Sequence, residues 1–301
     1  MKDYLVIYNK KAGSDNNEKI AKHFNKRAQQ NRRSTDLKAT TSRKEAIEFI
    51  VDHLAHYRTL VTIGGDGSIN TVFTAFLRAK KSIRVGIIPG GTVNNFAKAL
   101  NIPENESEAI EVILTGKPHA VDLIHTQKRA IISSLTLGTL ADMARNVSQN
   151  EKRKWGPIIY LIKGIKQLIA KKSYRIEVHY GNSGSKIYQT RFLLATTTNS
   201  IGGFTNFDTS ASPSDDKIHL VILKHFSISR LLGYVGYFLT GQFQKVSDVD
   251  QLQADQFQIS TTDPDTQIET RIDGDPSEQL PIKLNVERKF IDVIVPDHQG
   301  S

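Results

Sequence analysis

One short stretch of this 301-residue chain combines three glycines with a carboxylate, in the order Gly64-Gly65-Asp66-Gly67-Ser68. Glycine lets a backbone turn sharply and come close to a ligand. The first amides of a helix are unsatisfied donors with a partial positive charge behind them, so they bind phosphate well. Asp66 would repel a phosphate, but a Mg²⁺ ion between them would remove that repulsion, because it binds carboxylate, water and phosphate oxygens together. The stretch therefore predicts a metal-assisted site for a nucleotide polyphosphate.

A plainer interpretation makes the same stretch a tight turn between a strand and a helix, with Asp66 serving only to cap a helix. Short glycine-rich motifs often occur without a ligand, so the residues alone leave both interpretations open. The chain contains no G-x-x-x-x-G-K-[ST] sequence, and the glycines do not follow the G-x-G-x-x-G spacing. The two phosphate-binding loops that those spacings identify are therefore excluded.

The residues around the glycines predict the elements that hold them. Residues 60–63 form an apolar, β-branched run that is typical of a buried strand. Ser68 fits an N-cap, because an apolar stripe at helical spacing starts at Ile69. A second run, residues 83–88, predicts a strand that ends at Pro89-Gly90-Gly91-Thr92 and is followed by a helix. Both glycine motifs thus lie at the carboxyl ends of predicted strands, where open parallel sheets bind ligands.

Strands and helices alternate through about the first 120 residues, which predicts a mostly parallel sheet covered by helices on both faces. After about Val121 the pattern changes to many strands with few helices, which indicates an antiparallel β-sandwich. The strands predicted in this part include residues 174–180, 187–198, 218–223 and 282–295. We therefore expect an α/β + β fold. Residues 1–125 would form a Rossmann-like α/β nucleotide-binding domain and residues 126–290 an antiparallel β-sandwich domain. The C-terminal tail, about residues 291–301, could return to the first domain.

Two predicted helices interrupt the second half, at about residues 157–171 and 227–243. The first lies in a basic segment, residues 152–175, and a basic helix of this kind can lie on an anionic membrane. The commoner alternative is a helix packed on a sheet with its lysines in water. The second helix is apolar enough to belong mostly to the core. An exposed edge strand of the sandwich could also pair with a second copy of the chain, so a homodimer is one expected arrangement.

The composition limits the classes of partner that this chain is expected to bind. A net charge of +9 favours acidic partners, which include nucleotides, nucleic acids and anionic membrane surfaces. No recognisable nucleic-acid-binding module accompanies that charge, so we expect no nucleic acid partner. The chain has no cysteine, which excludes disulfides and thiolate metal sites, and it has no apolar run of about 18 residues that would span a membrane. We therefore expect a cytoplasmic protein.

Two motifs together resemble the catalytic domain of the diacylglycerol kinase family, which also covers sphingosine and ceramide kinases. They are Gly64-Gly65-Asp66-Gly67-Ser68-Ile69-Asn70 and Pro89-Gly90-Gly91-Thr92-Val93-Asn94-Asn95-Phe96-Ala97. The start of the first motif would be shared with NAD kinases and phosphofructokinases, whereas the second motif points to the lipid kinases. Further matches follow in the family's order along nearly the whole chain: Asn9, Gly13-Ser14, Thr41, Val121-Asp122, Gly202-Gly203, Asp215-Asp216 and Ile272-Asp273-Gly274-Asp275. The chain is most similar to the soluble bacterial diacylglycerol kinases, whose active site lies between an α/β nucleotide domain and a β-sandwich domain.

The resemblance implies that ATP lies across the loop of residues 64–68 and that Mg²⁺ accompanies it. The residues that it assigns to the nucleotide are Asn9, Gly13, Ser14, Thr41, Gly64, Gly65, Asp66, Gly67, Ser68, Asn70, Gly91, Thr92 and Asn95. Asp66 and Asp122 would hold Mg²⁺, partly through water. Asp215 and Asp216 match a structural metal site in the second domain, although Lys217 stands where the family usually has glycine.

Two positions depart from the family's pattern. Asn95 stands in place of an aspartate, which removes one negative charge from the implied metal network. Asp275 stands in place of the glutamate that supplies the family's catalytic base, and its side chain is one methylene shorter. A misplacement of about 1 Å can cost on the order of 100-fold in rate. The resemblance gives the catalytic roles to Asp275 and Asp66, and the two departures bear on activity more than on fold.

The implied function is an ATP- and Mg²⁺-dependent lipid kinase that phosphorylates the hydroxyl of diacylglycerol or a related lipid alcohol. Such an enzyme meets an insoluble substrate at a surface, so we expect peripheral contact with the anionic inner face of the membrane. Two alternatives stay open. One is a non-catalytic nucleotide- or lipid-binding protein, which Asn95 and Asp275 favour; the other is an NAD kinase-like enzyme, which the second motif disfavours.

Overall fold

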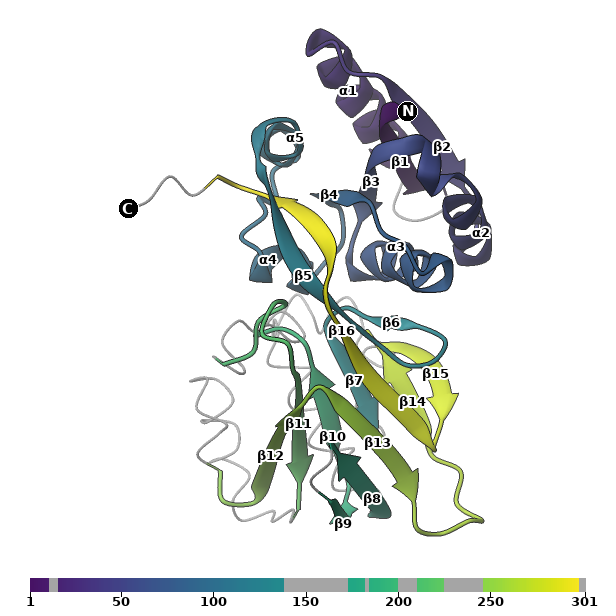
Figure 1. Ribbon diagram of the computed structural model, residues 1–301, viewed down its shortest axis with the longest axis vertical. Helices are drawn as coiled ribbons and strands as arrows, with labels where there is room; N and C mark the ends of the chain where they lie inside the picture. Colours follow the sequence, from purple (N-terminus) through teal and green to yellow (C-terminus); the bar gives the residue numbers. More distant parts are fainter. Residues whose placement is uncertain (11–15, 138–172, 182–183, 200–209, 225–245, 298–301) are drawn as a thin grey trace, which may run out of the picture. The chain divides into compact units, whose positions relative to one another are not determined.

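The structure is a computed structural model that describes residues 1–10, 16–137, 173–181, 184–199, 210–224 and 246–297 (Figure 1). The chain forms two compact units. The first contains Met1–Leu123, Lys128–Ile132 and Glu287–Ser301, and the second contains Ile124–Gln127 and Ser133–Val286. The long strand β16 (Ile282–Val295) contributes its N-terminal part to the second unit and its C-terminal part to the first.

The first unit is built on a parallel sheet with the strand order β2-β1-β3-β4-β16. Four of its strands are β1 (Lys2–Asn9), β2 (Thr35–Thr40), β3 (Tyr57–Gly64) and β4 (Arg84–Pro89). The fifth is the C-terminal part of β16 (Ile282–Val295), which pairs with β4 through Val293 and Val85. Strands β1, β3 and β4 are buried almost throughout, as expected for a parallel sheet covered on both faces. A further strand, β5 (Lys117–His125), pairs with β16 and with the short β6 (Ala130–Ile131).

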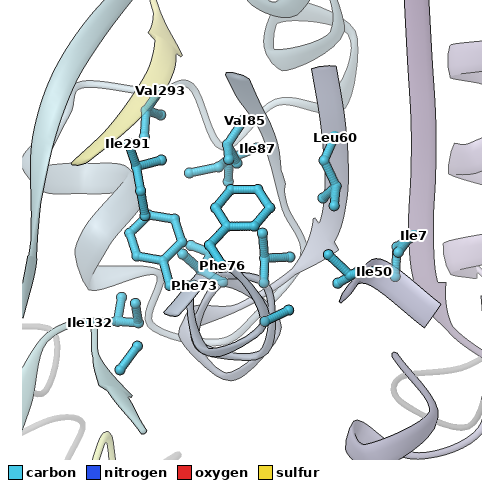
Figure 2. Close-up of a cluster of buried hydrophobic side chains, with 14 of the residues drawn as sticks. Ile7, Ile50, Leu60, Phe73, Phe76, Val85, Ile87, Ile132, Ile291 and Val293 are labelled. Carbon is cyan, nitrogen blue, oxygen red and sulfur yellow. The ribbon is translucent and has the colours of Figure 1, made fainter. Parts of the chain in front are cut away.

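Helices cover both faces of this sheet. The helices are α1 (Asn16–Gln30), α2 (Arg43–His53), α3 (Asp66–Ala79), α4 (Asn95–Ala99) and α5 (Glu106–Thr115), with a 3-10 turn η1 (Leu54–His56) after α2. On one face, Phe73 and Phe76 of α3 pack with residues of β4 and β16 (Figure 2). On the other face, Phe24 of α1 and Ile110 of α5 belong to a second buried cluster. The predicted α/β architecture of the N-terminal part is confirmed.

The second unit consists of antiparallel sheets. One sheet places β13 (Gln256–Thr261) between the N-terminal part of β16 and β8 (Tyr174–Tyr180), with β9 (Ser185–Thr190) beyond β8. The other has the order β12-β11-β10-β7-β14-β15. Its strands are β12 (Val249–Ala254), β11 (Ile218–Leu223), β10 (Leu193–Thr196), β7 (Ser134–Leu137), β14 (Glu269–Ile272) and β15 (Asp275–Gln279). The antiparallel prediction for the C-terminal part is confirmed.

Some predicted elements differ from the observed ones. Residues 187–198 read as one strand, but the chain divides there into β9 and β10. At the division, the hydroxyl of Thr190 accepts the N–H of Phe192 at 3.0 Å and donates to the carbonyl of Leu223 at 2.7 Å. The predicted helices at residues 157–171 and 227–243 lie outside the described residues. None of the helices that the structure describes has the length and apolar character needed to cross a membrane.

Candidate active site

The two glycine motifs form adjoining loops at the carboxyl ends of neighbouring strands. Gly64 and Pro89 are paired at the ends of β3 and β4, and the N–H of Gly90 donates to the carbonyl of Gly64 at 3.0 Å. The backbones are so close that a Cβ atom added to Gly91 would lie 2.6 Å from the Cα atom of Gly65. Gly64 has a φ of +147°, and a Cβ atom there would overlap the hydroxyl of Ser68. Glycine is therefore required for this close approach of the two loops.

Helix α3 begins earlier than the sequence suggests. Ser68 was expected to be its N-cap, but this prediction is wrong, because the helix starts at Asp66 and Gly65 is the N-cap. The N–H of Ser68 instead donates to the carbonyl of Gly65 at 2.9 Å. The two preceding glycines allow the chain to turn into the helix at once, since neither carries a side chain that would limit the turn. Asp66 therefore stands in the first turn, where a negative charge is favourable.

The carboxylate of Asp66 joins the two motifs. Its Oδ2 atom accepts the backbone N–H of Asn95 at 3.0 Å, and its Oδ1 atom accepts that of Phe96, also at 3.0 Å. These amides open α4, the helix of the second motif. Asp66 thus caps a helix, but not the one that contains it.

The loop of the second motif is held by Asn94, which has a left-handed φ of 56°. Its side chain accepts the N–H of Gly91 at 3.0 Å and donates both to the carbonyl of Gly91 at 3.1 Å and to Glu104 at 3.2 Å. Glu104 also pairs with Lys98 at 3.2 Å. The hydrogen bond from Asn94, followed by that from Lys98, lowers the pKa of the Glu104 carboxyl. Thr92 is exposed within this fixed loop, and Asn95 is buried behind it.

Asn70 is fully buried on the inner side of α3. Its amide donates to the carbonyl of Ala130 at 2.7 Å, and its oxygen accepts hydrogen bonds from Arg43, from Arg129 at 3.2 Å and from Thr74 at 3.3 Å. These contacts connect α3 with α2 and with the residues around β6. A contact between Asn70 and the nucleotide stays a prediction.

The other predicted nucleotide residues lie at the ends of β1 and β2. The carbonyl of Asn9 accepts a hydrogen bond from Asn17 of α1 at 3.2 Å. Thr41 donates through its N–H and its hydroxyl to Glu45, at 2.8 and 3.0 Å, and Ser42 caps α2 by accepting the N–H of Glu45. The N–H of Thr41 is the main reason why the pKa of the Glu45 carboxyl is lowered. Gly13 and Ser14 lie outside the described residues.

Asp122 is buried on β5, with 6% of its surface exposed. Its Oδ1 atom accepts the N–H of Lys289 at 2.8 Å. Lys289 has a left-handed φ of 50° within β16, so Asp122 stabilises an irregular point of that strand. This contact between β5 and β16 could not be inferred from the sequence, because 167 residues separate the partners.

The predicted base, Asp275, lies in the second unit at the start of β15 and is exposed. It follows a two-residue turn in which Asp273 and Gly274 have φ angles of 52° and 89°. The Oδ1 atom of Asp273 accepts three hydrogen bonds, from the N–H of Ser133 at 2.8 Å, its hydroxyl at 3.1 Å and the N–H of Ser134 at 3.0 Å. Through these bonds, Asp273 connects the turn before Asp275 with the start of β7. Asp273 belongs to one of the predicted motifs, but its residue type and spacing alone predicted no role for it.

Comparison with known proteins identifies the family of this chain. Residues 3–126 match the diacylglycerol kinase catalytic domain, and residues 133–295 match the YegS C-terminal NAD kinase beta sandwich-like domain. This chain belongs to the diacylglycerol kinase family. The catalytic-domain match contains both glycine loops, Asp66 and Asp122, and the sandwich-like match contains Asp215 and Asp275.

Individual relatives agree with this membership in the diacylglycerol kinase family. A diacylglycerol kinase from Bacillus subtilis (strain 168) is 25% identical over 305 residues, which cover 100% of this chain and 99% of that protein. A crystal structure of a diacylglycerol kinase from Bacillus anthracis str. Sterne superposes with a TM-score of 0.75 at 15% identity, covering 98% of this chain and 97% of that one. An NAD kinase from Archaeoglobus fulgidus in complex with ATP gives a TM-score of 0.56 at 11% identity, covering 98% and 94% of the two chains. Both structural likenesses support the fold alone.

The donor set for Mg²⁺ in this diacylglycerol kinase family member is small. Among the residues that the structure describes, no three His, Cys, Asp or Glu side chains form a group that could hold a metal ion by themselves. Proteins usually bind Mg²⁺ through one or two carboxylates, with substrate phosphates and water completing the shell. Asp66 and Asp122 are each a carboxylate of the kind that such a site uses, and their binding to one Mg²⁺ ion stays a prediction.

Proposed function

We propose that this chain is an ATP- and Mg²⁺-dependent lipid kinase that transfers the γ-phosphate of ATP to the hydroxyl of diacylglycerol or a related lipid alcohol. One structural observation carries the proposal: two glycine loops touch backbone to backbone at the ends of β3 and β4, and the carboxylate of Asp66 connects them. Membership in the diacylglycerol kinase family supports both the lipid acceptor and a nucleotide as the phosphate donor.

The chain's own groups have distinct tasks in this proposal. The two glycine loops receive the phosphates, since the glycines let a ligand approach the backbone. The N–H groups of Gly90 and Gly91 themselves hold the second loop in shape, because they donate to Gly64 and to Asn94. Asp66 and Asp122 would hold Mg²⁺, which neutralises the charge of the phosphates during phosphoryl transfer. Asp275 accepts the proton of the lipid hydroxyl, and Asp273 keeps the turn before it in one conformation.

The backbone N–H and the side-chain amide of Asn95 have different roles in the proposed site. Its backbone N–H donates to Asp66, a bond that any residue other than proline could make. Its side chain is a neutral amide that attracts a cation less than a carboxylate would, although it can still accept a hydrogen bond from bound water. We therefore expect the enzyme to need a higher Mg²⁺ concentration than a relative with aspartate at this position.

The decisive experiment measures the transfer of labelled γ-phosphate from ATP to a panel of lipid alcohols in mixed micelles, with Mg²⁺ supplied. We expect a labelled phospholipid product that disappears when Mg²⁺ is chelated. If no lipid alcohol is labelled, the kinase proposal is wrong, and two further assays distinguish what replaces it. Calorimetric ATP binding without turnover would indicate a non-catalytic binding protein, and NADP formation from NAD would indicate an NAD kinase.

The membrane contact of the enzyme is part of the same proposal. A net charge of +9 would bring the protein to an anionic surface, with about 1 kcal/mol gained for each basic residue close to that surface. The predicted contact segment, residues 152–175, lies almost entirely outside the described residues. Sedimentation with vesicles of increasing phosphatidylserine content should carry down more protein, and an unchanged bound fraction would argue against electrostatic attachment.

A further inference from the structure

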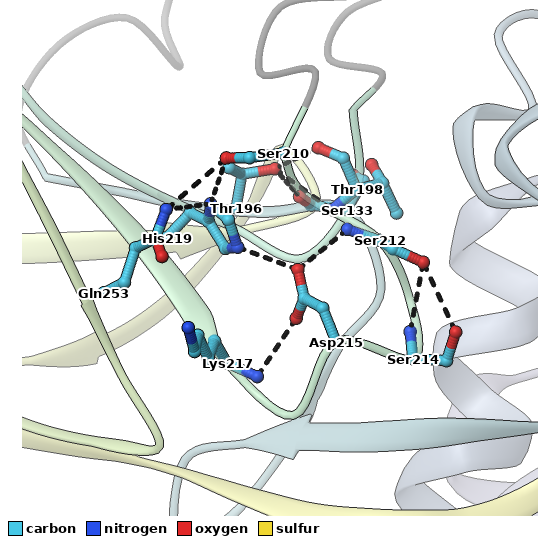
Figure 3. Close-up of polar contacts among 10 residues, drawn as sticks. All are labelled: Ser133, Thr196, Thr198, Ser210, Ser212, Ser214, Asp215, Lys217, His219 and Gln253. Atoms are coloured by element: carbon cyan, nitrogen blue, oxygen red, sulfur yellow. Dashed lines mark hydrogen bonds and ion pairs between the residues drawn. The ribbon is translucent and has the colours of Figure 1, made fainter.

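The loop before β11 is closed by a single carboxylate (Figure 3). The Oδ1 atom of Asp215 accepts the backbone N–H of Lys217 at 3.0 Å. Its Oδ2 atom accepts the N–H of Ser212 at 2.9 Å and lies 2.8 Å from Nε2 of His219. Asp215 is thus bound by three donors from its own loop and from the strand that follows.

The imidazole of His219 is fixed from both sides. Only 3% of the residue is exposed, and it lies opposite Gln253 in the pair of β11 and β12. The amide nitrogen of Gln253 lies 3.4 Å from Nδ1 of the imidazole, and the hydroxyl of Ser210 lies at the same distance. An amide nitrogen can only donate, so Nδ1 is the acceptor. Nε2 therefore carries the proton that the imidazole donates to Asp215.

At Asp215, this arrangement does not fit the structural metal that the family resemblance implies for Asp215 and Asp216. Mg²⁺ requires about six oxygen ligands at about 2.0–2.1 Å in near-octahedral geometry. On Oδ2, a buried N–H group occupies a side of the carboxylate from which a cation would approach. The turn also has its left-handed residue at Asp216, with a φ of 62°, and Lys217 contributes a backbone donor to the same carboxylate.

We infer that the loop of residues 210–219 folds without a metal ion, and that the imidazole N–H of His219 performs the stabilising task that a cation would perform at Asp215. The loop then owes its conformation to hydrogen bonds that are present in the chain itself. Mg²⁺ would act only at the first unit, on Asp66 and Asp122. This inference concerns the second unit and does not depend on the proposed kinase activity.

Hydrogen exchange of the full-length protein tests the inference directly, because it reports the local opening of single segments. In the wild type, we expect the amides of Ser212 and Lys217 to exchange at the same rate in Mg²⁺, in Ca²⁺ and in EDTA. Slower exchange of these amides in either metal would overturn the inference, whatever the kinase assay shows.

Three substitutions at one position give the matched controls. In His219→Leu, which removes the donor, exchange of the two amides should accelerate about tenfold or more, the size expected when a hydrogen bond to a charged group is lost. His219→Gln keeps an N–H at a similar reach and should stay within about threefold of the wild type, by the same reasoning. His219→Asp places a second carboxylate against Asp215, so its loop should become protected by Mg²⁺. A Leu variant that exchanges like the wild type would contradict the role given to the imidazole.

Discussion

Replacing Asp66 by alanine should damage the fold as well as any activity. The side chain accepts two backbone amides at the start of α4, each at 3.0 Å. A hydrogen bond to a charged group contributes about 1.5–3 kcal/mol, and the loss of a helix cap costs about 0.5–2 kcal/mol. These two figures describe overlapping effects, so we expect Asp66→Ala to lower the free energy of unfolding of the first unit by about 2–4 kcal/mol.

The loss in stability should be visible as a lower melting temperature. A change of 1 kcal/mol moves the midpoint by about 2–4 °C in a domain of this size, which gives a decrease of about 4–16 °C. Hydrogen exchange at Asn95 and Phe96 gives the local counterpart, since these amides lose their acceptor. Asp52 of α2 is exposed, so Asp52→Ala is a matched control that should change neither quantity.

A second variant separates the capping role of Asp66 from its proposed metal role. Asp66→Asn keeps one acceptor oxygen but turns an NH₂ group toward the other amide, so it should retain about half of the capping energy. It removes the whole charge, so its kinase activity in Mg²⁺ should fall as far as that of Asp66→Ala. Wild-type activity in Asp66→Asn would refute the metal role. Wild-type stability and amide protection in Asp66→Ala would refute the capping role.

Three further predictions concern the second unit and the edge of the first. Asp275→Glu should preserve or raise the kinase rate, whereas Asp275→Asn should lower kcat by at least about 100-fold, as expected for a lost general base; a collapse of the Glu variant would exclude Asp275 as the base. In Asp273→Gly, the glycine tolerates the left-handed φ but lacks the acceptor for Ser133, so this variant should have a lower kcat and faster amide exchange in the turn. Asp273→Asn keeps an acceptor oxygen and should resemble the wild type. Equal behaviour of the two variants would mean that the acceptor does not matter. Burial, followed by the hydrogen bond to Asp36, raises the pKa of Tyr57 to about 12. The folded protein then holds this proton where the unfolded chain releases it, so stability should fall by up to about 2–3 kcal/mol as the pH rises from about 10 to 12. The free energy of unfolding of Tyr57→Phe, measured by denaturation, should decline less than that of the wild type over the same pH range. An equal decline would disprove the contribution assigned to the raised pKa of Tyr57.

The elements of regular structure were the most predictable part of the molecule. The runs 174–180, 218–223 and 282–295 were expected as strands and are observed as β8, β11 and β16 with the same ends. Their apolar and β-branched residues predict a strand directly, because one or both faces of each strand are buried. Strand β15 was not expected, because its sequence Asp-Pro-Ser-Glu-Gln is poor in such residues and forms a strand only by pairing with β14.

The contacts within the site were much less predictable. The glycines correctly indicated a turn at the end of β3, but they could not show that Asp66 binds amides 29 and 30 residues further along the chain. Those bonds arise because β3 and β4 are neighbours, which brings the two loops together. In the same way, the pairing of Asp215 with His219 depends on the turn at Asp216, where glycine would be the usual signal for a left-handed residue.

The position of β16 at the end of the chain affects how the first unit folds during synthesis. Its C-terminal part completes the sheet of the first unit: Val293 pairs with Val85, and Ile291 and Val293 are fully buried with Phe73 and Phe76. The ribosome adds about 5–20 residues per second, so this strand emerges about 10–40 s after β4. During that interval the edge of β4 is open to other strands, and the nascent N-terminal unit is most exposed to wrong pairing before its last partner arrives.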